Sequence, residues 1–493
     1  MPSPSRRWLF ADQLGPHFLD AADQPVVLVE SRAALRRRRF HRQKAHLVLS
    51  ALRHRAAELG EQATLLRTDT YSEALARLST PLSVCAPTTR AADAFVRGLS
   101  GVEVLPARGF ATSREEFDTW ARGRRRLLLE DFYRHSRQRL GILMDGAEPV
   151  SGRWNHDADN RERPPKGARR LDLEPPWLPE EDEIDAEVRR DLDAWERAGD
   201  ISTVGRDGPR TFAATRAEAV QALDHFVANR LPVFGPYEDA MLAADRYLAH
   251  SHLSGALNLG LLDPVECAQA AERAYLDGAA PLASVEGYVR QVIGWRDYVW
   301  HIYWHTDADY ASSNALRATE PLPRWFIELD ADAVEARCLA TVLRQVRDHG
   351  WVHHIPRLLV LANYALQRGW DPKALSDWFH TSFVDGYEWV MVPNVVGMSQ
   401  HADGGLMATK PYAVGGAYIN RMSDFCADCR YRPDRRRGDD ACPYTAGYWT
   451  FLDRNRETLA GNHRMRQPLL GLERLGDVPE VVAQERERGA RAP

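Results

Sequence analysis

The first 130 residues alternate between short apolar runs and amphipathic stretches. The stretches from Phe40 to Leu59 and near Ala74 to Leu78 carry apolar residues at helical spacing. The short runs are bounded by turn residues, as buried parallel strands are. This β-α-β-α order predicts a doubly wound parallel sheet with right-handed crossovers. The predicted strands are Trp8–Phe10, Val26–Val29, Thr64–Leu66, Leu82–Cys85 and Val102–Leu105.

The pattern changes twice further along the chain. Residues 146–210 hold two Pro-Pro pairs, many acids and few apolar positions, which predicts a linker. Residues 211–493 are almost wholly helical in pattern. We therefore predict an α/β domain over 1–145, a linker over 146–210 and a large all-α domain over 211–493. The predicted helices of the last domain are 216–229, 238–249, 264–276, 282–304, 334–349, 355–368 and 372–384.

Composition sets limits on the class of protein. The chain has 493 residues, 44% of them hydrophobic and 27% charged, which suits a globular protein of several domains. No apolar run reaches the roughly 18–20 residues of a membrane span, and the N-terminus lacks secretory features, so we expect a cytoplasmic protein without a membrane partner. The net charge of -5 does not indicate a nucleic-acid partner, although three basic clusters permit one. These clusters are Arg36–Arg39, Arg122–Arg126 and Arg435–Arg437.

The cysteines fall into two groups. Cys85 and Cys267 stand alone in apolar contexts, as buried inert thiols do. Cys426 and Cys429 form a Cys-x-x-Cys turn that can aim two sulfurs at one metal, and the polar loop after it can bring round Cys442. Such a set suits a structural zinc or an iron–sulfur cluster, and spacing does not choose between them. A redox Cys-x-x-Cys normally opens a helix after a strand, and no strand pattern precedes this one.

The helical half also contains long motifs that resemble the photolyase–cryptochrome superfamily. Gly350–Leu358 (GWVHHIPRL), Asp385-Gly386-Tyr387 and Asn394 resemble its flavin-cradling segments. Val392–Met422 with the following Ser-Asp-Phe-Cys is similar to the iron–sulfur bacterial branch, which contains prokaryotic (6-4) photolyases and related cryptochromes. The likeness extends to the N-terminal half through Asp12–Leu14, Gly141–Gly146 and Gly152–Asn155.

The resemblance implies FAD in the helical domain. Ser251–Ser254 is similar to the family's phosphate-binding turn, where hydroxyls and N–H groups at a helix start suit a pyrophosphate. Arg357 and Asp385 correspond to an ion pair beside the isoalloxazine ring, and Asn394 to a position near flavin N5. The implied FAD contacts are Tyr237, His250, Ser251, His252, Leu253, Ser254, Gln291, Arg296, Arg357, Asp385 and Asn394.

Two further groups are implied by the same resemblance. A 4Fe–4S cluster would be held by Cys338, Cys426, Cys429 and Cys442, and its all-cysteine ligation predicts a structural role. The N-terminal domain would hold an antenna chromophore, 6,7-dimethyl-8-ribityllumazine. Its candidate contacts lie where ligands of doubly wound sheets bind, at the carboxyl ends of the first two strands, and could equally be helix caps. These contacts are Asp12, Gln13, Glu30 and Ser31.

The implied activity is light-driven repair of (6-4) photoproducts in UV-damaged DNA. Reduced flavin, once excited, donates an electron to a flipped-out lesion. Splitting the adduct also requires proton transfer, for which histidine is suited near neutral pH. We predict His354 as the proton donor with His353 in support, and Tyr412 and Tyr418 as stacking residues of the lesion pocket. A repair groove that accepts long duplex DNA favours a monomer.

Photoreduction of a flavin needs oxidisable aromatic residues leading to the surface. Trp378 matches the inner tryptophan of the iron–sulfur branch, with Trp325 or Trp389 as candidates for the next position. The sequence departs from the family here, because Phe379 stands in place of a tyrosine and Met398 in place of a tryptophan. These departures keep open a cryptochrome, which senses light without repair. A third alternative is a metal-containing structural protein that has lost its flavin.

Overall fold

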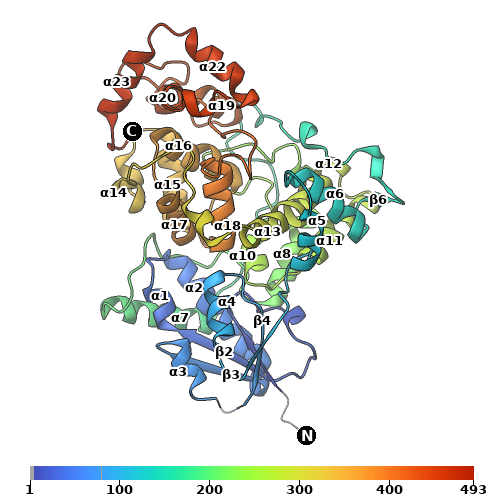
Figure 1. Ribbon diagram of the computed structural model, residues 1–493. Coiled ribbons are helices and arrows are strands. Elements are labelled where there is room, and N and C mark those ends of the chain that lie inside the picture. Colours follow the sequence, from blue (N-terminus) through green and yellow to red (C-terminus); the bar gives the residue numbers. More distant parts are fainter. Residues whose placement is uncertain (1–4, 79) are drawn as a thin grey trace.

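The computed structural model describes residues 5–78 and 80–493, arranged as an α/β region beneath a larger helical body (Figure 1). In the described chain five strands form one parallel sheet in the order β3-β2-β1-β4-β5. The predicted doubly wound sheet is confirmed. The strands are β1 (Arg6–Leu9), β2 (Val26–Ser31), β3 (Ala63–Thr68), β4 (Leu82–Cys85) and β5 (Val102–Leu105).

Strand β2 shows why the sheet's strands are apolar runs without alternation. Val26 and Leu28 face the core that contains α2 (Arg42–Leu59), while Val27 and Val29 face a second core on the opposite side of the sheet. A strand covered on both faces must be apolar at every position. The first of these cores is continuous with the helical body, so the sheet and the helices share buried surface.

The predicted linker contains one helix that the sequence pattern did not reveal. Helix α7 (Glu183–Arg197) lies against α2 and buries Val188 and Leu192 between them. Charges also join the two helices, because Asp191 pairs with Arg53 of α2 at 2.6 Å. Ile184, Val188, Leu192 and Trp195 do recur at helical spacing, but the acidic and proline-rich surroundings outweighed this pattern in the prediction.

Helices α5 (Arg114–Ala121) and α6 (Leu129–Leu140) precede the predicted boundary at 145 but pack against the helical body (Figure 1). The ring of Tyr133 lies where a side chain on Gly294 would reach, at 3.1 Å from its Cβ position. This close approach places α6 against the helical domain and away from the sheet.

Most predicted helices of the helical body are present, and one is absent. Residues 238–249 form an irregular loop, so the helix predicted there is wrong. Met241 N–H donates to Met422 O at 2.9 Å, and Ala243 N–H donates to Asp424 Oδ1 at 2.8 Å, which ties the loop to a distant segment. The confirmed elements include α8 (Arg216–Asn229), α11 (Pro264–Leu276), α12 (Leu282–Val289), α13 (Asp297–His305), α15 (Arg337–His349), α16 (Asn363–Arg368) and α17 (Pro372–Ser382).

Three of the helical segments are π-helical: η5 (Arg290–Arg296), η8 (Pro356–Ala362) and η9 (Val392–Ser399). Such turns are rare and are frequently found at functional sites, because the extra residue turns side chains away from the regular helical direction. Each of the three carries at least one of the predicted flavin contacts. The irregular backbone therefore coincides with the predicted site.

The C-terminal helices close one end of the molecule (Figure 1). Helix α23 (Val478–Arg488) packs on α20 (Pro443–Arg454), and α19 (Gly416–Met422) lies beside α20. The loop between α19 and α20 carries three of the four predicted metal ligands. None of the helices that the structure describes is both long enough and apolar enough to cross a bilayer.

Candidate functional site

A buried ion pair joins three segments of the helical body. Arg357 in η8 donates from Nη1 to Asp385 Oδ1 at 2.9 Å and from Nη2 to Oδ2 at 3.0 Å. Ser254 Oγ donates to Asp385 Oδ2 at 2.7 Å, and Asn258 Nδ2 donates to the carbonyl of Asp385 at 3.0 Å. A bidentate guanidinium–carboxylate pair fixes both side chains in one orientation. The two residues that the resemblance pairs are thus paired in the structure.

Lys44 reaches this region from α2 of the α/β region. Its Nζ donates to the carbonyl of His380 at 2.7 Å and to that of Gly386, beside Asp385. Burial lowers the pKa of Lys44 to about 7, against the opposing effect of Asp385. Nothing in the residue pattern indicated this contact, because a lysine on an amphipathic helix usually faces solvent.

Three histidines cluster next to Arg357. The rings of His250 and His353 stack with centroids 4.2 Å apart, and His354 meets His250 edge-on at 5.3 Å. Burial lowers the pKa of His250 and His353 well below the usual value, and the nearby positive charges act in the same direction. His354 has an exposed side chain, yet loss of hydration and the charges of Arg357 and Arg290 lower its pKa to about 4. All three rings are therefore neutral at pH 7.

Glu238 is a buried acid that the sequence prediction missed. Gln291 Nε2 donates to Glu238 Oε1 at 2.6 Å. Burial raises the pKa of Glu238 to about 8, although Arg290 opposes this effect. Its carboxyl group is therefore largely protonated at neutral pH and can donate a proton. Its position directly after Tyr237 was the only indication in the sequence, and the predicted helix obscured it.

Tyr412 and Tyr418 lie around one group of charges. Asp239 and Arg161 influence both phenols, and the two charged groups approach to 4.0 Å. Burial raises the pKa of both tyrosines, so they are neutral phenols. Asp239 adjoins Glu238 in the chain, which places the two tyrosines on the same side of the site as the protonated acid.

Two arginines flank the predicted phosphate-binding turn without carboxylate partners. Arg296 donates to the carbonyls of Gly109 at 2.9 Å and Leu257 at 3.2 Å. Arg230, which was not predicted, donates to the carbonyls of Leu248 and Glu174. Within residues 5–78 and 80–493, neither guanidinium lies within ion-pair distance of an acid. A buried cation without a counter-charge is costly, so this turn suits an anionic group such as a diphosphate.

The turn itself offers unused polar atoms. The Nε2 atoms of His250 and His252 are buried and lack a hydrogen-bond partner among the described residues. His252 adopts a φ of 57°, which a non-glycine residue reaches only when its surroundings enforce it. Arg230, His250, Ser251 and His252 all line one pocket. The donor set and its positive charge fit the phosphates of FAD.

The remaining predicted flavin contacts are placed less distinctively. Asn394 Nδ2 donates to the carbonyl of Val390 at 2.9 Å, one turn back in the helix. Leu253 is buried in the shared core, and Tyr237 packs beside Leu248 on the irregular loop. The contacts of these residues stabilise the local backbone of the site.

The antenna candidates separate into two pairs. Asp12 and Gln13 lie between β1 and β4, where the strand order reverses and ligands of such sheets bind. Thr88 Oγ1 donates to Asp12 Oδ2 at 2.6 Å. Glu30 instead forms a buried ion pair with Arg53 at 2.8 Å, and Ser31 Oγ donates to a backbone carbonyl at 3.0 Å. Gln13 Nε2 also donates to the carbonyl of Cys85 at 3.0 Å, so both pairs make contacts within the fold and only the first lies where the strand order reverses.

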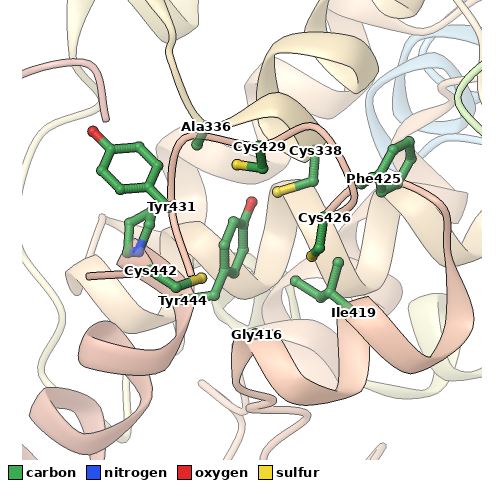
Figure 2. A pocket seen from close by; sticks show the side chains of 11 residues that line it. Ala336, Cys338, Gly416, Ile419, Phe425, Cys426, Cys429, Tyr431, Cys442 and Tyr444 are labelled. Atoms are coloured by element: carbon green, nitrogen blue, oxygen red, sulfur yellow. The ribbon is translucent and has the colours of Figure 1, made fainter. Parts of the chain in front are cut away.

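The four predicted metal ligands converge on one pocket (Figure 2). Cys338 stands in the first turn of α15, Cys426 and Cys429 lie in the turn after α19, and Cys442 immediately precedes α20. Figure 2 shows the four sulfur atoms gathered around the ring of Tyr444, and all four cysteines are free thiols. The pocket encloses about 300 Å³, including its open side.

The surroundings of these thiols favour a metal centre. Burial and the neighbouring thiols raise the pKa of Cys426 to about 12, and burial raises the pKa of Cys338 and Cys442. Only a positive centre reverses such shifts and stabilises several adjacent thiolates. A side chain on Gly416 would place its Cβ 2.7 Å from Cys442 Sγ, so this glycine keeps the space open. The four-cysteine donor set fits an iron–sulfur cluster and equally a structural zinc.

The predicted electron-transfer residues occupy two different places. Trp378 donates from Nε1 to the carbonyl of Phe326 at 3.2 Å, and Trp325 lies on the far side of Phe326, with ring centroids 5.7 Å apart. Trp389 belongs to another aromatic cluster, with Phe110 at 5.2 Å. Trp325 and Trp378 are thus brought into one aromatic group, and Trp389 is not.

The basic clusters also differ. Arg36, Arg38 and Arg39 pair with acids, as do the three arginines at 435–437. Arg122, Arg125 and Arg126, between α5 and α6, are exposed and form no ion pair with any described residue. Arg37 of the first cluster is likewise exposed and outside any ion pair among the described residues, but the arginines at 122–126 present the larger group of free positive charges to a polyanion.

Comparisons with known proteins agree with this arrangement. Residues 7–203 match the family model for deoxyribodipyrimidine photo-lyase-related proteins. A (6-4) photolyase from Agrobacterium fabrum is 41% identical over an alignment 492 residues long. The alignment covers 93% of this chain and 94% of that protein.

Two solved structures share the fold at low sequence identity. A bacterial class III photolyase from Agrobacterium tumefaciens has a TM-score of 0.58 at 15% identity and covers 100% of this chain and 97% of its own. A cryptochrome from Synechocystis has a TM-score of 0.57 at 12% identity, with 99% of both chains covered. The identity to the Agrobacterium fabrum relative and the family match establish that this chain belongs to the bacterial branch of the photolyase–cryptochrome superfamily, whose members bind FAD.

Proposed function

We propose that this protein is a photolyase that repairs (6-4) photoproducts in UV-damaged DNA. The observation that carries the proposal is the cluster of His250, His353 and His354 against the Arg357–Asp385 pair, in a chain 41% identical to a (6-4) photolyase. Flavin and a proton source are the two requirements of this reaction, and the cluster joins the segments predicted for both.

The chain's own residues have distinct roles in the proposed reaction. FAD, when reduced and photoexcited, supplies the electron that destabilises the lesion. His354 is the exposed member of the cluster and offers its N–H to the lesion, while the stacked, buried His353 holds it in position. An anionic group in the site raises the pKa of His354 from about 4 toward neutrality by charge attraction. Protonated Glu238 is a second proton source on the side of Tyr412 and Tyr418.

Other features are part of the same proposal. Tyr412 and Tyr418 stack on the extruded bases, and the unpaired arginines at 122–126 contact the DNA backbone. The four cysteines hold a structural 4Fe–4S cluster, and the edge at Asp12 and Gln13 binds a ribityl lumazine antenna. We further propose a cytoplasmic monomer with the domain boundaries given above.

The test is repair of DNA containing a single (6-4) photoproduct by purified, reduced protein, in blue light and in darkness. We expect restoration of the two pyrimidines only in light. Absence of repair by protein whose flavin is bound and photoreducible would instead identify a photoreceptor of the cryptochrome type.

The His354→Ala variant tests the mechanism. We expect repair to fall by about 10²–10⁴-fold, the usual contribution of a positioned proton donor, with FAD content unchanged. His463→Ala, which removes an exposed histidine far along the chain in the C-terminal region, is the matched control and keeps full repair. Full repair by His354→Ala would overturn this mechanism.

A further inference from the structure

A row of aromatic rings runs through the helical body from the Arg357–Asp385 pair toward the cysteines. Arg357 lies over the ring of Phe383 at 4.4 Å, and Phe383 contacts Trp378 with centroids 5.9 Å apart. Phe326 then lies between Trp378 at 4.2 Å and Trp370 at 4.8 Å. Trp370 was not among the predicted electron-transfer residues, yet it follows Trp378 in this row.

The row divides at Trp370. One branch leads to the partly exposed Trp325, with centroids 6.0 Å apart. The other leads inward to Tyr364 at 5.6 Å and from there to Tyr444 at a further 5.6 Å. Tyr444 lines the four-cysteine pocket (Figure 2). An uninterrupted series of ring contacts therefore joins the flavin side of the site to the cysteines.

We propose that this inner branch carries an electron from the four-cysteine iron–sulfur cluster to Trp370 during flavin photoreduction. The inference rests on the proposed function in that it needs both FAD and an iron–sulfur cluster, and it adds a redox role to the structural role proposed for that cluster. Electron transfer between rings weakens steeply with distance, so contacts of this kind are the favoured route through a protein.

The electrons balance without any bond being broken. Trp378 gives one electron to the photoexcited, oxidised flavin and is then reduced by Trp370 across Phe326. The cluster then reduces Trp370 by electron transfer across Tyr444 and Tyr364, and the cluster ends one electron more oxidised. The flavin ends one electron more reduced. The oxidant is thus the excited flavin and the reductant is the cluster.

The two tyrosines act as bridges between sites of oxidation. An oxidised tyrosine must release its proton, and no described group accepts a hydrogen bond from the hydroxyl of Tyr364. Arg368 also lies over the Tyr364 ring at 4.9 Å, which disfavours positive charge there. The hydroxyl of Tyr444 donates to the carbonyl of Val360, a weak base, at 3.1 Å and also contacts Cys338 of the four-cysteine site. The aromatic rings, and not the hydroxyls, are therefore what the route requires.

This distinction gives a sharp test. Oxidised holoprotein is illuminated with blue light under anaerobic conditions without added reductant, while flavin absorbance and the EPR spectrum are recorded. In the unsubstituted protein we expect an odd-electron iron–sulfur signal that grows in step with flavin reduction. Tyr364→Phe, which keeps the ring, retains the signal, and Tyr364→Leu loses it.

Controls separate the route from damage to the fold. Iron, sulfide and flavin contents are measured for each variant, and Trp370→Phe gives a second loss of signal should Tyr364→Leu fail to fold. Trp325→Phe alters only the outer branch and keeps the signal. An EPR-silent cluster beside a photoreduced flavin, or an undiminished signal in well-loaded Tyr364→Leu, would overturn the proposal.

The outcome is independent of repair. Chemically reduced protein needs no electron from the aromatic row, so Tyr364→Leu repairs (6-4) photoproducts normally once it has been reduced with dithionite. Loss of repair with an intact EPR signal would contradict the proposed function and leave this inference standing.

Discussion

The four-cysteine site and the histidine-lined flavin site are built in different ways. The first uses a single residue type, and three of its four members lie within one loop between α19 and α20. The second draws residues from the irregular loop at 237–253 and from three π-helical segments, and each residue is of an ordinary type. A site that depends on one scarce side chain is visible in a sequence, whereas a site that depends on backbone geometry is visible only as a family likeness.

The cysteine site should also be the one whose loss has the largest effect. Cys429→Ser leaves only three cysteine ligands for the cluster, and we expect insoluble protein. Cys85→Ala removes a buried cysteine outside the site and should remain soluble with full iron content. The measurement is the soluble fraction and iron per chain. Soluble, repair-active Cys429→Ser protein would show that the cluster is dispensable.

The flavin site should tolerate a change better, with loss of FAD before loss of fold. Asp385→Asn leaves the guanidinium of Arg357 without its charge partner, and breaking a buried pair of this kind costs about 3–5 kcal/mol. We expect a lower thermal midpoint and a large loss of bound flavin, measured from absorbance per chain. Glu183→Gln breaks the exposed pair with Arg190 and should change neither quantity.

Gly416 tests whether the space in the cysteine pocket matters as much as its sulfurs. Gly416→Ala places a methyl group 2.7 Å from Cys442 Sγ, and overpacking of this kind costs about 1–3 kcal/mol. We expect soluble protein with reduced iron content. Gly461→Ala, where the new methyl meets no atom within 4 Å, should keep its iron. Equal iron contents in the two variants would contradict the close packing.

The smallest expected effect is a pH dependence of the free energy of unfolding that comes from one buried histidine. His301 of α13 stacks on Phe117 of α5, and burial lowers the pKa of His301 to about 3, so the unfolded chain binds its proton first as the pH falls. Between pH 6.5 and 3 the free energy of unfolding should therefore decrease, by about 1.4 kcal/mol per pH unit for this group. Urea titrations at several pH values check this, and His301→Phe should reduce the slope by the contribution of this one group. An unchanged slope in that variant would assign the effect to other groups.

The pattern of apolar and polar residues predicted those elements whose apolar positions follow a single regular period. The five strands and the helices α8 and α11 follow from apolar runs and clean periodicity. Helix α7 and the loop at 238–249 did not follow, for opposite reasons. A narrow apolar stripe that includes Val188 and Leu192 docks α7 on α2, while the many apolar residues of the loop anchor an irregular path through contacts such as Met241 to Met422.

By itself the sequence determined the layered sheet, the helical body and three of the four cysteines, because these depend on residue type and spacing along the chain, whereas Cys338 joined them through the family resemblance. Only the tertiary structure decided that Glu238 is a protonated acid, that Lys44 and Arg230 lie beside the candidate site, and that Trp370 joins two aromatic branches. Burial, counter-charge and ring contact arise between segments far apart in sequence, and the spacing along one segment carries no record of them.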